Sequence, residues 1–186
     1  MANYLCRNIT ELPAYMFANV RVPASMTNGL KAGEVVTAET LDNQIRGNLV
    51  NYVPAAIADI TKEEWAIVLN GNFEEMSDGR RPEGNPNYTT YVYNPGEIAT
   101  AVRAESNVRF EISEDSCNAN VAAATIVPGD FLVPVNGATT LSYLSQTGAT
   151  ITAKKYLVIE ATKFFRLGGQ NGAQFAQTLV CRVKSL

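Results

Sequence analysis

Three acidic residues recur in one short local pattern that could supply catalytic carboxylates. The segments AGEVV, PGEIA and PGDFL place Glu34, Glu97 and Asp130 directly after a glycine. Dispersed carboxylates can act as general acids or bases where a fold brings them together. Proline or alanine followed by glycine also suits a type II turn, in which the next acid accepts backbone N–H groups or faces water before a strand begins. We favour the second interpretation, in which the three acids start strands.

Adjacent acids are the second candidate for chemistry, because glycoside hydrolysis uses two carboxylates across a cleft. Such pairs occur at residues 63–64, 74–75 and 114–115. The first lies where a helix is expected to begin, a position that favours acids for electrostatic reasons. None has a local setting that would raise a pKa. A histidine-free hydrolase that uses Glu114 or Asp115 is therefore the least favoured function.

The other residue types that usually carry chemistry are scarce. Histidine is absent, which removes the commonest general base and a frequent metal ligand. Cys6, Cys117 and Cys181 are odd in number and form no CxxC pair, so neither a zinc site nor a disulfide framework is indicated. Cys181 fits a buried strand position, whereas Cys117 lies in a polar run and could be exposed. We expect no enzyme activity, no cofactor and no metal.

Composition and charge place the chain among folded proteins without a nucleic-acid partner. Its 186 residues suit one domain, 46% of them are hydrophobic and 18% are charged. The net charge of −3 offers no basic field for a phosphate backbone. No window is long enough to cross a membrane, and the first residues do not resemble a signal peptide. We therefore expect neither a nucleic-acid nor a membrane partner, and folding in a reducing cytoplasm.

Most of the chain has the two-residue period of β-strands. In NVRFEI, the apolar residues Val108, Phe110 and Ile112 alternate with polar ones. Residues 88–93 are aromatic and β-branched, and four more strand-like segments follow Pro128: DFLVPV, TLSYLS, KYLVIEATKFFRL and QFAQTLVCRV. The segment LGGQNGA joins the last two and fits a hairpin loop rather than a phosphate-binding loop. The pattern predicts a mainly β protein, a small antiparallel β-barrel or sandwich with one short helix and an extended N-terminal arm.

The predicted helix covers residues 61–70. Thr61 and Glu64 form a capping-box pattern, and Asn70 and Gly71 supply a C-terminal stop. A second, weaker helix is indicated before it by the helical spacing of Leu41, Ile45 and Leu49, although Gly47 disfavours it.

The first 31 residues are apolar but have no sustained period. Pro13, Pro23 and an Asn28–Gly29 turn interrupt them. We interpret residues 1–31 as an extended arm that could lie on a neighbouring subunit, and residues 32–186 as a single β-rich domain. A first strand of the core would give a similar sequence and stays open as an alternative.

Three stretches together resemble the small β-rich structural proteins of tailed bacteriophages, in particular capsid decoration (cement) proteins. They are the apolar N-terminal arm, the PGDFLVPVNG segment, and the closing YLVIEATKFFRLGGQNGAQFAQTLVCRVKSL. The resemblance implies a structural virion protein, commonly trimeric, that binds the outside of a capsid and stabilises contacts between major capsid subunits. Its partner would be the major capsid protein, and its location the virion.

Such a role needs apolar area that is buried on assembly rather than a catalytic site. The partner-binding residues that we expect lie in the arm and in the loop 80–88: Phe17, Val20, Val22, Met26, Arg80, Arg81 and Tyr88. Packing within the chain explains the arm residues equally well. A carbohydrate- or receptor-binding β module of a phage fibre or baseplate, which would use exposed aromatic residues at loop tips, is the alternative function.

Overall fold

The computed structural model describes residues 4–42, 51–70, 91–167 and 174–186, with the side chains of residues 164–176 left aside. Strands dominate these residues, and the only α-helix among them is α1, Ala119–Ala122. Two short 3₁₀ turns, η1 (Ala14–Met16) and η3 (Glu114–Ser116), complete the helical part. The prediction of a mainly β protein with one short helix is confirmed.

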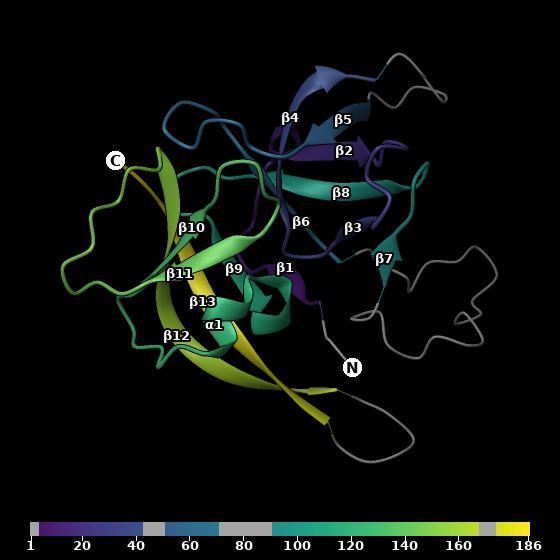
Figure 1. Ribbon diagram of the computed structural model, residues 1–186. Coiled ribbons are helices and arrows are strands. Elements are labelled where there is room, and N and C mark those ends of the chain that lie inside the picture. Colours follow the sequence, from purple (N-terminus) through teal and green to yellow (C-terminus); the bar gives the residue numbers. More distant parts are fainter. Residues whose placement is uncertain (1–3, 43–50, 71–90, 168–173) are drawn as a thin grey trace.

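One half of the molecule is a six-stranded antiparallel sheet (Figure 1). Its order is β1-β9-β13-β12-β10-β11. The strands, in that order, are Cys6–Asn8, Arg109–Ser113, Gln174–Ser185, Lys155–Leu167, Phe131–Pro134 and Leu141–Leu144. The strands predicted from residues 107–112 and from the segments after Pro128 are therefore confirmed. β12 and β13 form the predicted hairpin, in which Lys155 pairs with Ser185 and Leu167 with Gln174.

The other half is a closed five-stranded barrel of order β2-β5-β4-β6-β8. These strands are Phe17–Arg21, Asn51–Ala55, Val35–Leu41, Ala66–Val68 and Ile98–Arg103. β2 and β5 run parallel and close the barrel, whereas its other neighbours are antiparallel. Beside the barrel, β3 (Leu30–Lys31) and β7 (Val92–Tyr93) form a two-stranded sheet (Figure 1).

The alternation along the barrel strands separates two cores. One face of β2, β4, β6 and β8 carries small side chains that fill the barrel, among them Ala18, Val20, Ala66, Ala99 and Ala101, and Tyr52 of β5 packs against them. The opposite face of three of these strands packs on the six-stranded sheet through Val35, Ile67 and Val102, which share a cluster with Phe110, Ile112 and Leu179. A five-stranded barrel has a narrow interior, and small residues fill it without leaving a lumen.

The helix predicted at residues 61–70 is wrong. Thr61 lies in a turn, and the segment continues into strand β6. β6 pairs with β4 on one edge and β8 on the other, and all three of its residues are buried. Sheet hydrogen bonds on both edges and complete burial outweigh a local capping pattern, because helix propensity is a weak preference. Of the second predicted helix, Leu41 ends β4, and residues 43–50 lie outside the described part.

The separate N-terminal arm is also corrected. β1 pairs with β9 in the six-stranded sheet, and β2 lies between β5 and β8 in the barrel. Val20 and Val22 are completely buried in the barrel core. The segment belongs to the body of its own chain, as the alternative interpretation held. Ala18, Val20 and Val22 alternate along β2 and the residue that follows it and face the barrel core, a run too short to give the segment a sustained period.

Candidate functional site

The three glycine–acid segments form the same turn in three places. The glycine that precedes each acid has a left-handed backbone, with φ of +87°, +91° and +102°. In each turn the N–H of the acid donates to the carbonyl three residues earlier. The reverse bond closes the turn, since that earlier residue donates its N–H to the carboxylate: Lys31 to Glu34 at 2.7 Å, Asn94 to Glu97 at 2.7 Å, and Val127 to Asp130 at 2.8 Å. The interpretation of these acids as turn residues is confirmed.

Glu34 and Asp130 are buried, and further hydrogen bonds hold them. Thr139 donates its hydroxyl to Glu34 at 3.0 Å, and burial raises the pKa of Glu34 despite these bonds. Asp130 accepts the N–H of Gln146 at 3.0 Å and the hydroxyl of Tyr143 at 2.8 Å. Burial alone would raise the pKa of Asp130, but its hydrogen bonds outweigh that and lower it. These bonds attach each carboxylate to its own surroundings, and within the described residues none links one of the three acids to another.

Of the two acid pairs in the described residues, the pair at 63–64 contributes one carboxylate, Glu64, to the small cavity described below, which Glu39 and Glu105 also line. Glu64 bonds to Lys154 and Lys155, which are the first residues of the β12 region. Glu114 lies in η3, where burial and the neighbouring charge of Asp115 raise its pKa. Neither Glu114 nor Asp115 lines either of the two cavities described below. The third pair, residues 74–75, lies outside the described part.

All three cysteines are buried thiols in the core between sheet and barrel. The expectation that Cys117 could be exposed is wrong, because it packs below η3 and donates weakly to the Ser113 carbonyl. Burial raises the pKa of each thiol, and that of Cys117 to about 12. Among the residues that the structure describes, no group of three Cys, Asp or Glu side chains could hold a metal ion.

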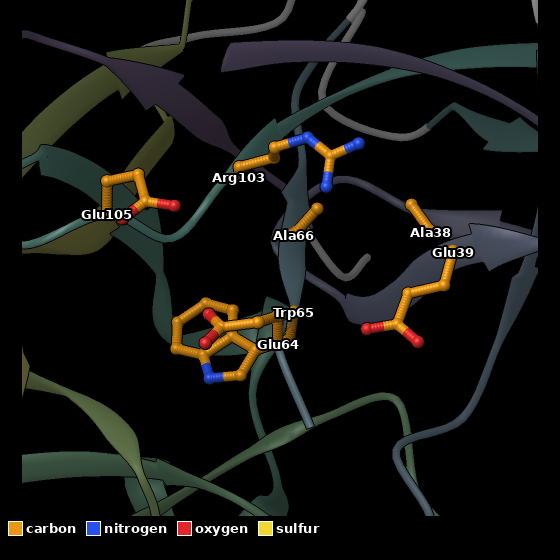
Figure 2. A pocket seen from close by; sticks show the side chains of 7 residues that line it. All are labelled: Ala38, Glu39, Glu64, Trp65, Ala66, Arg103 and Glu105. Atoms are coloured by element: carbon orange, nitrogen blue, oxygen red, sulfur yellow. The ribbon is translucent and has the colours of Figure 1, made fainter. Parts of the chain in front are cut away.

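A small cavity opens at one end of the barrel (Figure 2). The lining residues are Ala38, Glu39, Glu64, Trp65, Ala66, Arg103 and Glu105. Trp65 is buried, and its indole N–H donates to the Lys155 carbonyl at 3.3 Å. Arg103 lies at the rim with its guanidinium 5.6 Å from the centre of the Tyr52 ring. The cavity measures about 50 Å³. Sites for drug-sized ligands are typically about 300–1,000 Å³, so this one is too small for such a ligand.

A second cavity is larger and polar. It measures about 270 Å³ and lies where the loop after β2 meets the start of β4 and the loop between β10 and β11. Ser25, Met26, Thr27, Asn28, Gly29, Lys31, Glu34 and Thr139 line it. Sequence reasoning missed this site, because Thr139 is far from the other seven residues in the chain. The only local signal was the Asn28–Gly29 turn.

The residues predicted to bind a partner differ in their exposure to solvent. Phe17 is 39% exposed, and Met26 is partly buried at the second cavity. Val20 and Val22 are fully buried and cannot contact a partner without unfolding the barrel. Arg80, Arg81 and Tyr88 lie outside the described residues. Tyr15, beside Phe17, is 77% exposed and was not predicted.

The hairpin of β12 and β13 extends beyond the sheet that contains it (Figure 1). β9 pairs with β13 from Arg182 only as far as Thr178, and β10 pairs with β12 only at Leu157 and Val158. Residues 164–167 and 174–177 therefore pair only with each other in the described structure. Four residues at about 3.3 Å each make a projection of roughly 13 Å.

Comparison with known proteins gives no further guide: no family model, curated protein or solved structure matches the chain. None of the helices in the described residues has the length and apolar character required to cross a membrane.

Proposed function

We propose that this chain is a structural protein that works by binding another protein, and that it attaches to the outside of a bacteriophage capsid. The observation that supports this best is the projecting end of the β12–β13 hairpin. The capsid as partner rests on the resemblance of the sequence to decoration proteins. In this proposal the hairpin replaces the N-terminal arm as the main contact, because Val20 and Val22 are buried.

A two-stranded ribbon whose edges pair with no other described strand is suited to attachment. Isolated hairpins are marginally stable in water, so a long one gains stability when another surface covers it. Within the described part of the chain, the edges of this ribbon offer N–H and C=O groups to a strand of a partner. Lys163, an exposed residue at the base of the projection, disfavours indiscriminate pairing, since edge lysines oppose aggregation.

The composition of the projection supports a protein partner. Phe164, Phe165 and Phe175 belong to its paired strands. Aromatic residues are enriched in protein interfaces, where they bury large areas at a low cost in conformational entropy. On the described surface, the exposed Tyr15 and Phe17 are apolar residues that could be buried on assembly.

Density-gradient fractionation of source material, followed by mass spectrometry, tests the location. The proposal expects peptides of this chain at a fixed stoichiometry in virus-sized particles. Detection only among small soluble proteins would refute the capsid role, and it would equally contradict a fibre or baseplate module, which is also part of the particle.

A shortened hairpin tests the contact itself. Lys163 and Thr178 face each other in the register, so an Asn-Gly turn can replace residues 164–177. We expect this variant to keep its thermal unfolding temperature within a few degrees and to lose binding to particles that lack the protein. Unchanged binding would refute the hairpin's role. If the shortened chain does not fold, the triple variant F164S/F165S/F175S tests the same contact in the full-length hairpin.

A further inference from the structure

The larger cavity is held in shape by hydrogen bonds from three parts of the chain. Two successive turns fix its loop, since Met26 donates its N–H to Pro23 at 3.0 Å and Gly29 donates to Met26 at 2.9 Å. Gly29 has φ of +70°, and a side chain there would lie 2.5 Å from Val92. On the far side, Val35 donates its N–H to the Thr139 carbonyl at 2.6 Å. The walls are therefore positioned before any ligand arrives.

Glu34 is the buried polar group of this cavity. It is only 8% exposed, and each of its carboxylate oxygens accepts one hydrogen bond, from the Lys31 N–H and from the Thr139 hydroxyl. A carboxylate has about four acceptor positions, so about two remain for a donor in the cavity. The two bonds hold the carboxylate in one orientation.

The rim adds further unused hydrogen-bonding groups. Ser25, Thr27 and Asn28 are exposed there, and within the described residues their side chains make no hydrogen bond. Two hydroxyls, one amide and one fixed carboxylate thus surround a single hollow. Met26 is the one hydrophobic residue among those that line the cavity.

The charges of the cavity favour a neutral ligand. Lys31 and Glu34 both line the cavity and together give it no net charge, and the Lys31 ammonium group lies 4.8 Å from the centre of the Tyr4 ring. An anion would meet the Glu34 carboxylate. A ligand rich in hydroxyl groups can donate to Glu34 and exchange hydrogen bonds with the rim. We propose that this cavity binds a neutral polyhydroxylated ligand of monosaccharide size. At about 270 Å³ the space is just below that of typical drug-sized sites, about 300–1,000 Å³.

Titration followed by ¹H–¹⁵N NMR tests the site on the full chain. The probes are glucose, galactose and N-acetylglucosamine, with acetate and methylammonium as charged comparisons. We expect at least one sugar to give saturable shifts at the amides of Gly29, Lys31 and Thr139, with a dissociation constant on the order of 1 mM. Absence of saturable shifts with all three sugars would overturn the proposal. Shifts at these amides with acetate or methylammonium alone would overturn the choice of a neutral ligand.

Matched asparagine variants separate the cavity from the general surface. Asn28→Ala removes a rim amide and should weaken sugar binding about two- to tenfold, the effect of one hydrogen bond. Asn94→Ala is the control, because Asn94 is also an exposed turn residue but lies outside the cavity. Equal affinities for both variants would contradict the assigned site. If Asn28→Ala alters the loop, judged from the Gly29 amide without ligand, Ser25→Ala replaces it. The site is separate from the hairpin, so this test is independent of the proposed assembly role.

Discussion

The three glycine–acid turns differ in what surrounds the glycine, which allows backbone strain to be separated from packing. A Cβ added at Gly96 meets nothing within 4 Å. At Gly129 it meets the side-chain oxygen of Gln146 at 2.8 Å, and Gln146 is an exposed, flexible residue. At Gly33 it meets the Cβ of Ser116 at 2.4 Å and its Oγ at 2.8 Å. Replacing each glycine by alanine therefore measures backbone strain alone at Gly96, strain with a movable neighbour at Gly129, and strain with a fixed neighbour at Gly33.

The expected losses of stability follow from these surroundings. A left-handed backbone costs an alanine roughly 1–2 kcal/mol, and the stiffer unfolded chain returns about 0.4–1 kcal/mol. Gly96→Ala should therefore cost about 1 kcal/mol, and Gly129→Ala about the same, because Gln146 can move aside. Ser116 is buried and its hydroxyl bonds to that of Ser113, 2.9 Å away, so it cannot move. Overpacking adds roughly 1–3 kcal/mol, for a total of about 2–4 kcal/mol in Gly33→Ala.

Urea unfolding of the wild type and the three variants measures these differences, provided that the slope against denaturant stays constant. The predicted order of stability is wild type, then Gly96→Ala and Gly129→Ala together, then Gly33→Ala. A Gly33→Ala variant as stable as Gly96→Ala would refute the close packing of Gly33 on Ser116. A Gly96→Ala variant as stable as the wild type would refute the left-handed turn.

Two further predictions follow from the buried polar groups. Burial raises the pKa of Cys6, Cys117 and Cys181, so the native protein should not react with Ellman's reagent at pH 8. In the unfolded chain the reagent should detect three thiols. Rapid reaction of any thiol in the folded protein would contradict its burial. The pKa of Asp130 is lower in the folded state than in the unfolded chain, so its contribution to stability is present above pH 4, roughly its unfolded pKa, and is lost as the pH falls through the folded value. Asp130→Asn should be less stable than the wild type at pH 7 and should lose less stability on acidification, as measured by urea unfolding at several pH values. Parallel pH profiles for the two proteins would contradict this. The stability of Tyr143→Phe at pH 7 should lie between those of the two proteins, because this variant removes one donor to the carboxylate.

Local patterns predicted the strands well where apolar and polar residues alternate. Phe110 and Ile112 alternate with polar residues along β9, and this alternation is visible in the sequence even though Glu111 and Ser113 are buried as well. The same rule fails for β6, because Ala66 and Val68 are buried in the barrel core and Ile67 in the core between barrel and sheet, so the three residues show no alternation of apolar and polar types. With no period to read, the capping pattern before them was the strongest local signal, and it was misleading.

The candidate site was less predictable than the fold. The turn acids could be identified from the sequence, because each turn is formed by four consecutive residues that include the glycine and the acid. The second cavity could not, since Glu34 and Thr139 meet only when the barrel packs on the six-stranded sheet. The extension of the hairpin beyond its neighbours was equally hidden, because the length of β9 and the pairing of β10 determine where its edges become free.

The sequence by itself determined the mainly β class, the hairpin of the last two strands and the three turns, because each depends on side chains a few residues apart. Tertiary structure alone decided that the first strands belong to the body, that three distant cysteines share one core, and that a polar cavity forms beside Glu34. The physical reason is that burial and hydrogen-bond partners are properties of neighbours in space. For Val20, Cys117 and Glu34 those neighbours come from distant strands and loops.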